Sequence, residues 1–377
     1  MNLIPVLRPS YDYHESLAIN EVLKSGWSGL GPKTKLFEEE FSKYINTSYA
    51  VGLNSCTSAL WLALSVLNLQ PGDEIISTPL TFVSTIHAIC YNNLTPIFAD
   101  VDPITLCIDP QDIVRKITKR TRAIIAVHYA GHSCKLDMLQ KICKEYSLIL
   151  IEDCAHACGA EFNGQKIGSI SDLNCFSFHA VKNLSMADGG AITTSNPEYD
   201  KYFREMRWLS ISRDTFARTN ENEIYAWRYD VTRLGYKMHM NDLNASIGLV
   251  QLTKLDAANQ KRREIAQRYT EAFKTLNWIE TPVELSYAKS SWHLYVIKTP
   301  EESIRDRLIK HLKDRNIAPG VHYYPINLHS YYRNQNANID TPVSNKIWKR
   351  IISLPMFPDL TLEDQERVIN AILEFKP

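Results

Sequence analysis

The chain has 377 residues, of which 45% are hydrophobic, and its 42 Lys and Arg balance 42 Asp and Glu to a formal net charge of zero. This hydrophobic content is ample for a large core, which excludes disorder as the main state, and the length favours two domains. Because there is no basic excess, nucleic acid is not expected as a partner.

The eight cysteines form no Cys-x-x-Cys pair, and most lie in apolar runs, as Cys90 and Cys175 do. They are interpreted as reduced thiols of a cytoplasmic protein. The uncharged stretch before Arg8 is too short for a secretory signal, and no segment reaches the roughly 18 apolar residues of a membrane helix. We therefore expect a cytoplasmic protein with no membrane partner.

Short apolar runs, many of them β-branched, recur through the first half of the chain and are spaced like buried strands. Helical patterns lie between several of them: residues 57–67 are rich in Ala and Leu, and apolar residues recur every three or four positions over 136–146. This alternation predicts βαβ units and a mainly parallel sheet. The expected strands cover residues 75–76, 96–99, 123–127, 148–151, 175–178 and 191–193.

Polar residues end or follow several of these expected strands. Ligands of such sheets bind beyond the carboxyl ends of the strands, so these residues are the first candidates for a site. They are Thr78, Asp100, His128, Asp153 and Ser177.

From residue 241 to about 276 the pattern becomes one long helix, which we interpret as a connector between domains. Beyond it, a strand over 293–298, a helix over 303–316, an extended segment through His322 and an amphipathic helix over 362–375 indicate a smaller α+β domain. We therefore predict an α/β protein with a large domain over residues 1–245, followed by the connector helix and small domain over 246–377.

Residues 54–60, NSCTSAL, place small hydroxyl residues where a loop becomes a helix. The free amides and the dipole of a helix amino terminus favour an anion, so this turn suits a phosphate. Ordinary N-capping by Ser55 or Thr57 is the alternative interpretation.

The expected strand over 148–151 leads into two acids, Glu152 and Asp153. A carboxylate at this place could hold a protonated ring nitrogen, although a helix cap or a turn acid is the alternative. No His-x-x-x-His pair or carboxylate pair stands at ligand spacing on one helix, so no metal site is expected.

Residues 176–184, FSFHAVKNL, are followed by DGG at 188–190. They put Lys182 just beyond a strand end, five residues after the Ser177 hydroxyl, where a lysine can form a Schiff base. A single lysine after a strand is usually a solvated surface residue. The segment therefore indicates a Schiff-base lysine only when other motifs of the chain support it.

Together with six other motifs, this segment forms a series of seven in a fixed order: NSCTSAL, TPLTFVST, PIFADVD, EDCAHA, SFHAVKNL with DGG, GYKMHMND and GVHYYP. In this order the chain resembles the DegT/StrS, or DegT-type, nucleotide-sugar aminotransferase family over nearly its whole length. The resemblance implies a fold-type I enzyme that uses pyridoxal 5'-phosphate (PLP), with pyridoxamine phosphate (PMP) as intermediate. It also implies a homodimer with shared active sites.

The resemblance implies a role for each residue that matches a family motif. Lys182 would be the Schiff-base lysine and proton shuttle, Asp153 the partner of the pyridine nitrogen, and His156 a neighbour of the ring hydroxyl. Phe82 would stack on the cofactor. The cofactor phosphate would be held by Cys56, Thr57 and Ser177.

The resemblance also implies residues outside this set. Lys237 lies where the family often has Asn, and it would reach the cofactor phosphate from the neighbouring subunit. The substrate would be contacted by Trp27, Ser28, His322 and Tyr323.

The expected activity moves an amino group from an amino acid, L-glutamate by resemblance, to a nucleotide-linked keto-deoxy sugar. The motif wording favours C4 of a dTDP-4-keto-6-deoxyglucose type of substrate, in amino-sugar synthesis for O-antigen lipopolysaccharide or a related polysaccharide. The alternatives are a 3-keto-sugar aminotransferase, a PLP- or PMP-dependent sugar dehydratase, in which His would replace Lys182, and a non-catalytic regulatory protein of the same fold.

Overall fold

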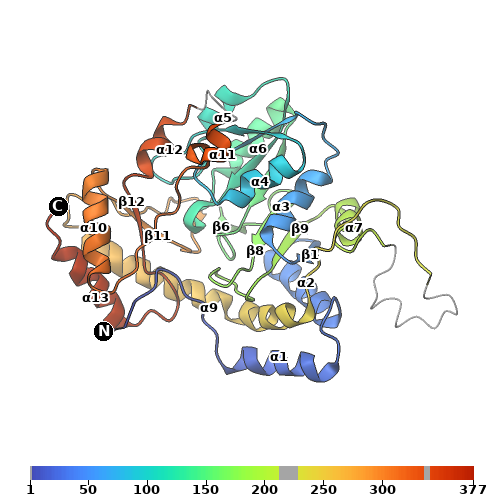
Figure 1. Cartoon of the computed structure of the whole chain (residues 1–377), viewed down its shortest axis with the longest axis horizontal. Coiled ribbons are helices and arrows are strands. Elements are labelled where there is room, and N and C mark those ends of the chain that lie inside the picture. The colour runs from blue at the N-terminus through green and yellow to red at the C-terminus, as the bar shows by residue number, and fades with distance from the viewer. Residues whose placement is uncertain (1, 212–227, 335–339) are drawn as a thin grey trace.

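The computed structural model describes residues 2–211, 228–334 and 340–377, and a seven-stranded sheet lies at its centre (Figure 1). The strand order is β1-β9-β8-β5-β4-β2-β3. β9 pairs antiparallel with both of its neighbours, while β8, β5, β4, β2 and β3 pair in parallel. The prediction of a mainly parallel sheet is therefore confirmed. The strands are β1 (Tyr49–Leu53), β2 (Glu74–Ser77), β3 (Thr95–Phe98), β4 (Thr121–Val127), β5 (Ile149–Asp153), β8 (Leu173–Ser177) and β9 (Gly190–Thr194).

The sheet is covered on both faces, and β4 shows how its sequence requires this. Ile124 and Ala126 pack into the core on one face of the sheet, while Ala123 and Ile125 pack into the core on the other. Because side chains alternate across a strand, a continuous apolar run buries both faces only when each face carries a layer of helices.

The covering helices alternate with the strands, as the sequence pattern predicts. Their starts carry recognisable caps: the Ser55 side chain caps α3, and Asp12 and Glu15 form a capping box at the start of α1. The helices of this part are α1 (Tyr13–Ser25), α2 (Pro32–Ile45), α3 (Cys56–Ser65), α4 (Val83–Tyr91), α5 (Pro110–Lys116), α6 (Leu136–Tyr146) and α7 (Pro197–Met206).

The long helix α9 (Asp242–Phe273) links the central sheet to the C-terminal part of the chain, and α1 packs along it (Figure 1). Here β11 and β12 form an antiparallel pair with a separate core shared with α10 and α13. The domain boundary at residues 245 and 246 stays a prediction. The remaining elements are β6 (Glu161–Phe162), β7 (Gln165–Lys166), β10 (Ala288–Lys289), β11 (Tyr295–Lys298), α10 (Glu302–Lys313), α11 (Ser330–Arg333), α12 (Pro342–Ile347), β12 (Ile351–Leu354) and α13 (Leu362–Leu373).

Several element boundaries differ from the sequence pattern. The expected strand over 293–298 begins at Tyr295, because Leu294 instead bonds the backbone of Ala130. The long helix ends at Phe273 rather than near 276, and α10 ends at Lys313 rather than 316. None of the helices in the described ranges has the length and apolarity that a membrane span needs.

Candidate active site

A cavity of about 410 Å³ opens at the carboxyl ends of the sheet strands. β5 ends at Asp153 and β8 ends at Ser177, while the loop after β1 contributes Ser55. The structure thus brings together most of the predicted site residues from segments far apart in the sequence. Those that line the cavity are Cys56, Thr57, Phe82, Asp153, His156, Ser177, Lys182, His322 and Tyr323.

Asp153 is only 3% exposed, and its carboxylate is held from two sides. The Thr85 hydroxyl donates to Oδ2 at 2.8 Å, and the Ala155 N–H donates to Oδ1 at 3.1 Å. Burial raises the pKa of Asp153, while these two hydrogen bonds and the Lys182 cation act against that rise. Among the described residues, no cation lies within ion-pair distance of this carboxylate. It is therefore available to a cationic group that enters the cavity.

Lys182 lies in the turn after β8, where its N–H donates to the carbonyl of His179 at 2.9 Å. Burial lowers the pKa of Lys182 from 10.5 to about 8, although the nearby Asp153 carboxylate favours the cation. A primary amine is a nucleophile only when it is neutral. The cavity therefore holds an amine that is reactive toward a carbonyl near neutral pH.

The start of α3 forms the wall of the cavity that suits an anion. Ser55 is the N-cap, since its hydroxyl accepts from the Ser58 N–H at 3.1 Å, and Cys56 and Thr57 occupy the first helical turn. Gly190 of β9 lies against this turn, and a Cβ there would come within 2.5 Å of the Cys56 nitrogen. Glycine is needed for this close approach, which sets the helix amino terminus beside the cavity.

Another part of the cavity lining is formed by His156, His322 and Tyr323. The Tyr323 hydroxyl and His156 Nε2 lie 3.0 Å apart, and their rings stack with a centroid distance of 6.0 Å. His322 Nδ1 lies 2.8 Å from the Ser353 hydroxyl on β12. Each ring is therefore fixed by a partner from another segment.

His156, His293 and His322, which line the cavity with Lys182, are uncharged at neutral pH. Burial and, to a smaller extent, the Lys182 cation together lower the pKa of His322 to about 4. Burial, with the same cation contributing, holds the pKa of His156 and of His293 well below the usual range. These side chains therefore present neutral donors and acceptors rather than charges to a ligand.

Phe82 is the N-cap residue of α4 and stays 58% exposed although it lines the cavity. Its ring lies 6.2 Å from that of Tyr323, measured between centroids. An exposed aromatic face at the mouth of a cavity can stack on a planar ligand. The position agrees with the stacking role that the resemblance implies, and that role stays a prediction.

Three predicted residues do not line the cavity within this chain. Trp27 and Ser28 lie in the connection between α1 and α2, and Trp27 Nε1 donates to the Leu30 carbonyl at 3.0 Å. This connection is held at the start of α9, where the Asp242 N–H donates to the Gly29 carbonyl at 2.8 Å. The substrate contacts that the resemblance implies for Trp27 and Ser28 therefore stay a prediction.

Lys237 also lies outside the cavity and is exposed. Its backbone forms a bridge with Trp208, and its Nζ lies 5.5 Å from the centroid of the Trp208 ring. A contact with a second subunit, which the resemblance implies for Lys237, stays a prediction.

Thr85 and Leu7 line the cavity without having been predicted from the sequence. Thr85 stands three residues after Phe82 in the first turn of α4, so both side chains face the same side of the helix. The spacing of three residues from Phe82 could therefore have predicted Thr85 as a site residue from the sequence. Leu7 belongs to the N-terminal segment, whose position depends on contacts far along the chain, such as that of Ile4 with Asn316.

Of the five polar residues at expected strand ends, only Asp153 and Ser177 line the cavity. Asp100 instead accepts from the N–H groups of Val343 and Ser344, at 2.6 and 2.7 Å, and so holds the start of α12. Thr78 Oγ1 accepts from the Leu80 N–H within its own loop. Strand-end position therefore located the site but did not separate ligand-facing residues from structural ones.

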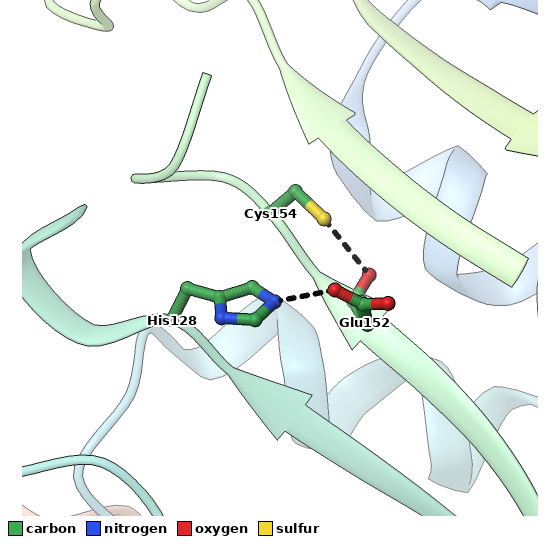
Figure 2. A group of neighbouring side chains, drawn as sticks. All are labelled: His128, Glu152 and Cys154. Atoms are coloured by element: carbon green, nitrogen blue, oxygen red, sulfur yellow. Dashed lines mark hydrogen bonds and ion pairs between the residues drawn. The ribbon is translucent and has the colours of Figure 1, made fainter. Parts of the chain in front are cut away.

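His128, Glu152 and Cys154 form a buried cluster whose potential ligand atoms all lie within 4.8 Å of one another (Figure 2). The Cys134 N–H donates to His128 Nδ1 at 3.1 Å, so in the neutral ring Nε2 carries the proton. That proton is donated to Glu152 Oε2 at 2.8 Å, while Oε1 accepts from the Ser171 N–H. Because both ring nitrogens of His128 and both carboxylate oxygens of Glu152 are used in hydrogen bonds within the protein, we interpret this cluster as a hydrogen-bonded structural element.

The residues of the cavity fit PLP. The buried Asp153 carboxylate, which lacks a cationic partner among the described residues, would meet the pyridine nitrogen, and Lys182 would meet the aldehyde. The glycine-backed turn at Cys56 and Thr57, together with Ser177, would hold the phosphate. When bound, PLP supplies an electron sink for carbanion chemistry at an amino-bearing carbon.

Fold and site together define a fold-type I, PLP-dependent transferase with a mostly parallel central sheet. Residues 9–373 match the model of the DegT/DnrJ/EryC1/StrS aminotransferase family, and the chain belongs to that family. The family resemblance drawn from the seven motifs is therefore confirmed.

Similar proteins agree with this placement. The spore coat polysaccharide biosynthesis protein SpsC of Bacillus subtilis is 38% identical, with 98% of this chain and 96% of SpsC covered. PseC of Helicobacter pylori, an aminotransferase involved in the biosynthesis of pseudoaminic acid, is 29% identical with a TM-score of 0.93, and 99% of each chain is covered. Spr1654 of Streptococcus pneumoniae, in its PMP form, is 32% identical with a TM-score of 0.92, and 98% of each chain is covered.

Proposed function

We propose that this protein transfers an amino group from L-glutamate to a nucleotide-linked keto-deoxy sugar, with PLP as the cofactor. The observation that carries the proposal is the pairing of a reactive amine and a buried carboxylate in one cavity. Lys182 has a pKa near 8, and Asp153 is buried. The solved PLP and PMP forms of Spr1654 support the choice of cofactor.

Asp153 and Lys182 have different roles in this reaction. Asp153 stabilises positive charge at the end of the cavity by β5, which keeps a ring nitrogen protonated. Lys182 Nζ accepts a proton from the substrate carbon when neutral and returns it when charged, which suits a residue whose pKa lies near physiological pH. A lysine with an ordinary pKa of about 10.4 would be almost entirely charged at physiological pH and therefore a poor proton acceptor.

The wall of His156, His322 and Tyr323 supports a sugar as the amino acceptor. Its imidazoles are neutral at physiological pH, and its hydroxyl is kept protonated because burial raises the pKa of Tyr323. Neutral donors and acceptors suit the hydroxyl groups of a deoxy sugar. A strongly charged acceptor would gain little from them.

The finer features of the proposal follow from the family resemblance. We infer amination at C4 of a dTDP-4-keto-6-deoxyglucose type of sugar, in the cytoplasm, for O-antigen or a related polysaccharide. The name of SpsC, which refers to polysaccharide biosynthesis, supports the last point. We also infer a homodimer in which Lys237 of one subunit reaches the cofactor phosphate of the other.

A panel of nucleotide-linked keto sugars tests this function. Each sugar is incubated with the PLP-loaded enzyme and L-glutamate, and the products are identified by mass spectrometry. The proposal expects an amino sugar from at least one 4-keto-6-deoxy substrate, and no amino sugar with Lys182→Ala. An amino group on C3 would favour the 3-keto alternative, while loss of water without gain of nitrogen would favour the dehydratase.

A further inference from the structure

A second, smaller cavity of about 30 Å³ lies beside the first, and Lys182 lines both. Three further cationic side chains line it: Arg8 from the N-terminal segment, and Lys254 and Arg262 from α9. Among the described residues no carboxylate lines this cavity. It therefore carries a concentration of positive charge beside Lys182.

Arg262 is the buried member of this group, with 2% of its surface exposed. Its Nη1 donates to the Met356 carbonyl at 2.9 Å, but its Nε is buried without a hydrogen-bond partner in the described structure. Burial lowers the pKa of Arg262 to about 10, and the distant Asp359 only partly offsets this. A buried guanidinium without a carboxylate partner is costly, and an anion in the cavity would remove part of that cost.

The other two cations differ in their partners. Lys254 is neutralised by Asp12 at 2.8 Å and by Glu15 at 2.7 Å. Arg8 is exposed, and the described structure gives its side chain no hydrogen bond or ion pair. Arg8 and Arg262 therefore supply the positive charge that is left uncompensated.

The size of the cavity selects among small anions. About 30 Å³ exceeds the roughly 10 to 15 Å³ that one water molecule requires, so a planar carboxylate fits and a diphosphate does not. The α-carboxylate of an amino acid is attached to the carbon that carries the transferred nitrogen, and Lys182 borders both cavities. We propose that Arg8 and Arg262 bind the α-carboxylate of the amino donor in this second cavity, an inference that rests on the proposed aminotransferase function.

The first measurement of this site is independent of catalysis. Glutarate, a dicarboxylate without an amino group, is titrated calorimetrically into the PLP-loaded enzyme, and glutaramide serves as the uncharged control. Arg8→Met is expected to weaken glutarate binding about 10- to 100-fold, as for loss of a charge-assisted hydrogen bond. Arg262→Lys, which keeps the charge but loses the planar fork, should weaken it several-fold.

The second measurement separates the two half-reactions. Arg8→Met should raise the KM for L-glutamate at least tenfold more than the KM for the keto sugar. Arg307→Met is the matched control, because Arg307 is an exposed arginine of α10 whose contacts, with the Lys376 carbonyl and the Phe375 ring, lie outside both cavities. It should change neither KM by more than about twofold.

Wild-type affinity for glutarate in both Arg8→Met and Arg262→Lys would overturn the assignment. Equal loss in the two half-reactions of Arg8→Met would also overturn it, because it would indicate a general structural effect. If the variants lose glutarate but the wild-type enzyme transfers no amino group from any amino acid, the carboxylate site stands and the proposed function fails.

Discussion

The pKa of Lys182 makes a quantitative prediction about the capture of PLP. Only the neutral amine attacks the cofactor aldehyde, so the rate of capture by enzyme freed of cofactor should rise with pH and level off above the pKa of Lys182. With a pKa of about 8, about a quarter of the enzyme is reactive at pH 7.5. An unperturbed lysine with a pKa of 10.5 would be reactive in about one molecule in a thousand.

The perturbation that tests this reasoning is Asp153→Asn. The Asp153 carboxylate favours the Lys182 cation, so removing its charge should move the midpoint of the capture rate below pH 8. Stopped-flow absorbance at a series of pH values measures the midpoint, and Lys182→Ala provides the baseline without capture. A midpoint near 10.5 in the wild type, or a rise in midpoint with Asp153→Asn, would refute the account of the cavity's electrostatics.

Three further predictions concern catalysis, assembly and stability. Asp153→Asn should keep most of its PLP but lose about two to three orders of magnitude in kcat, and near-normal turnover would place the ring partner elsewhere. Lys237→Ala should be inactive alone, because it loses a charge-assisted contact with the cofactor phosphate. Mixing it with inactive Lys182→Ala should restore activity through hybrid dimers. If subunit exchange is confirmed and no activity returns, shared sites are excluded. Asp100→Ala should lower the free energy of unfolding, measured by urea titration, by about 3 kcal/mol, because the N–H groups of Val343 and Ser344 lose their acceptor. A change below about 1 kcal/mol would contradict this.

The central strands could be predicted from the sequence because their signal is local. Residues 123–127 of β4 are apolar at every position, and such a continuous run indicates a strand that is buried on both faces without information from the rest of the chain. β1 gives a weaker signal, because its five residues include Gly52 and its partner β9 lies more than a hundred residues away. The helix α1 was readable from the Asp12 and Glu15 capping box, which the apolar pattern does not reveal.

Some site residues could likewise be predicted from local sequence, while others depend on long-range packing. Asp153, Ser177 and Lys182 follow strands whose positions are set by the sheet, so strand-end reasoning and the family motifs agree on them. Arg8 and Arg262 meet beside Lys182 only after α9 and the N-terminal segment have packed together. No local pattern in the sequence predicts that Arg8 and Arg262 lie close together, because most of the chain separates them.

Transfer of labelled nitrogen tests the central claim most directly. L-Glutamate labelled with ¹⁵N at its amino group is incubated with the PLP-loaded enzyme and a nucleotide-linked 4-keto-6-deoxy sugar, and the sugar product is analysed by mass spectrometry. The account predicts that ¹⁵N appears in the sugar with the wild-type enzyme and not with Lys182→Ala. A sugar product that has lost water and gained no nitrogen, or label transfer that persists in Lys182→Ala, would contradict it.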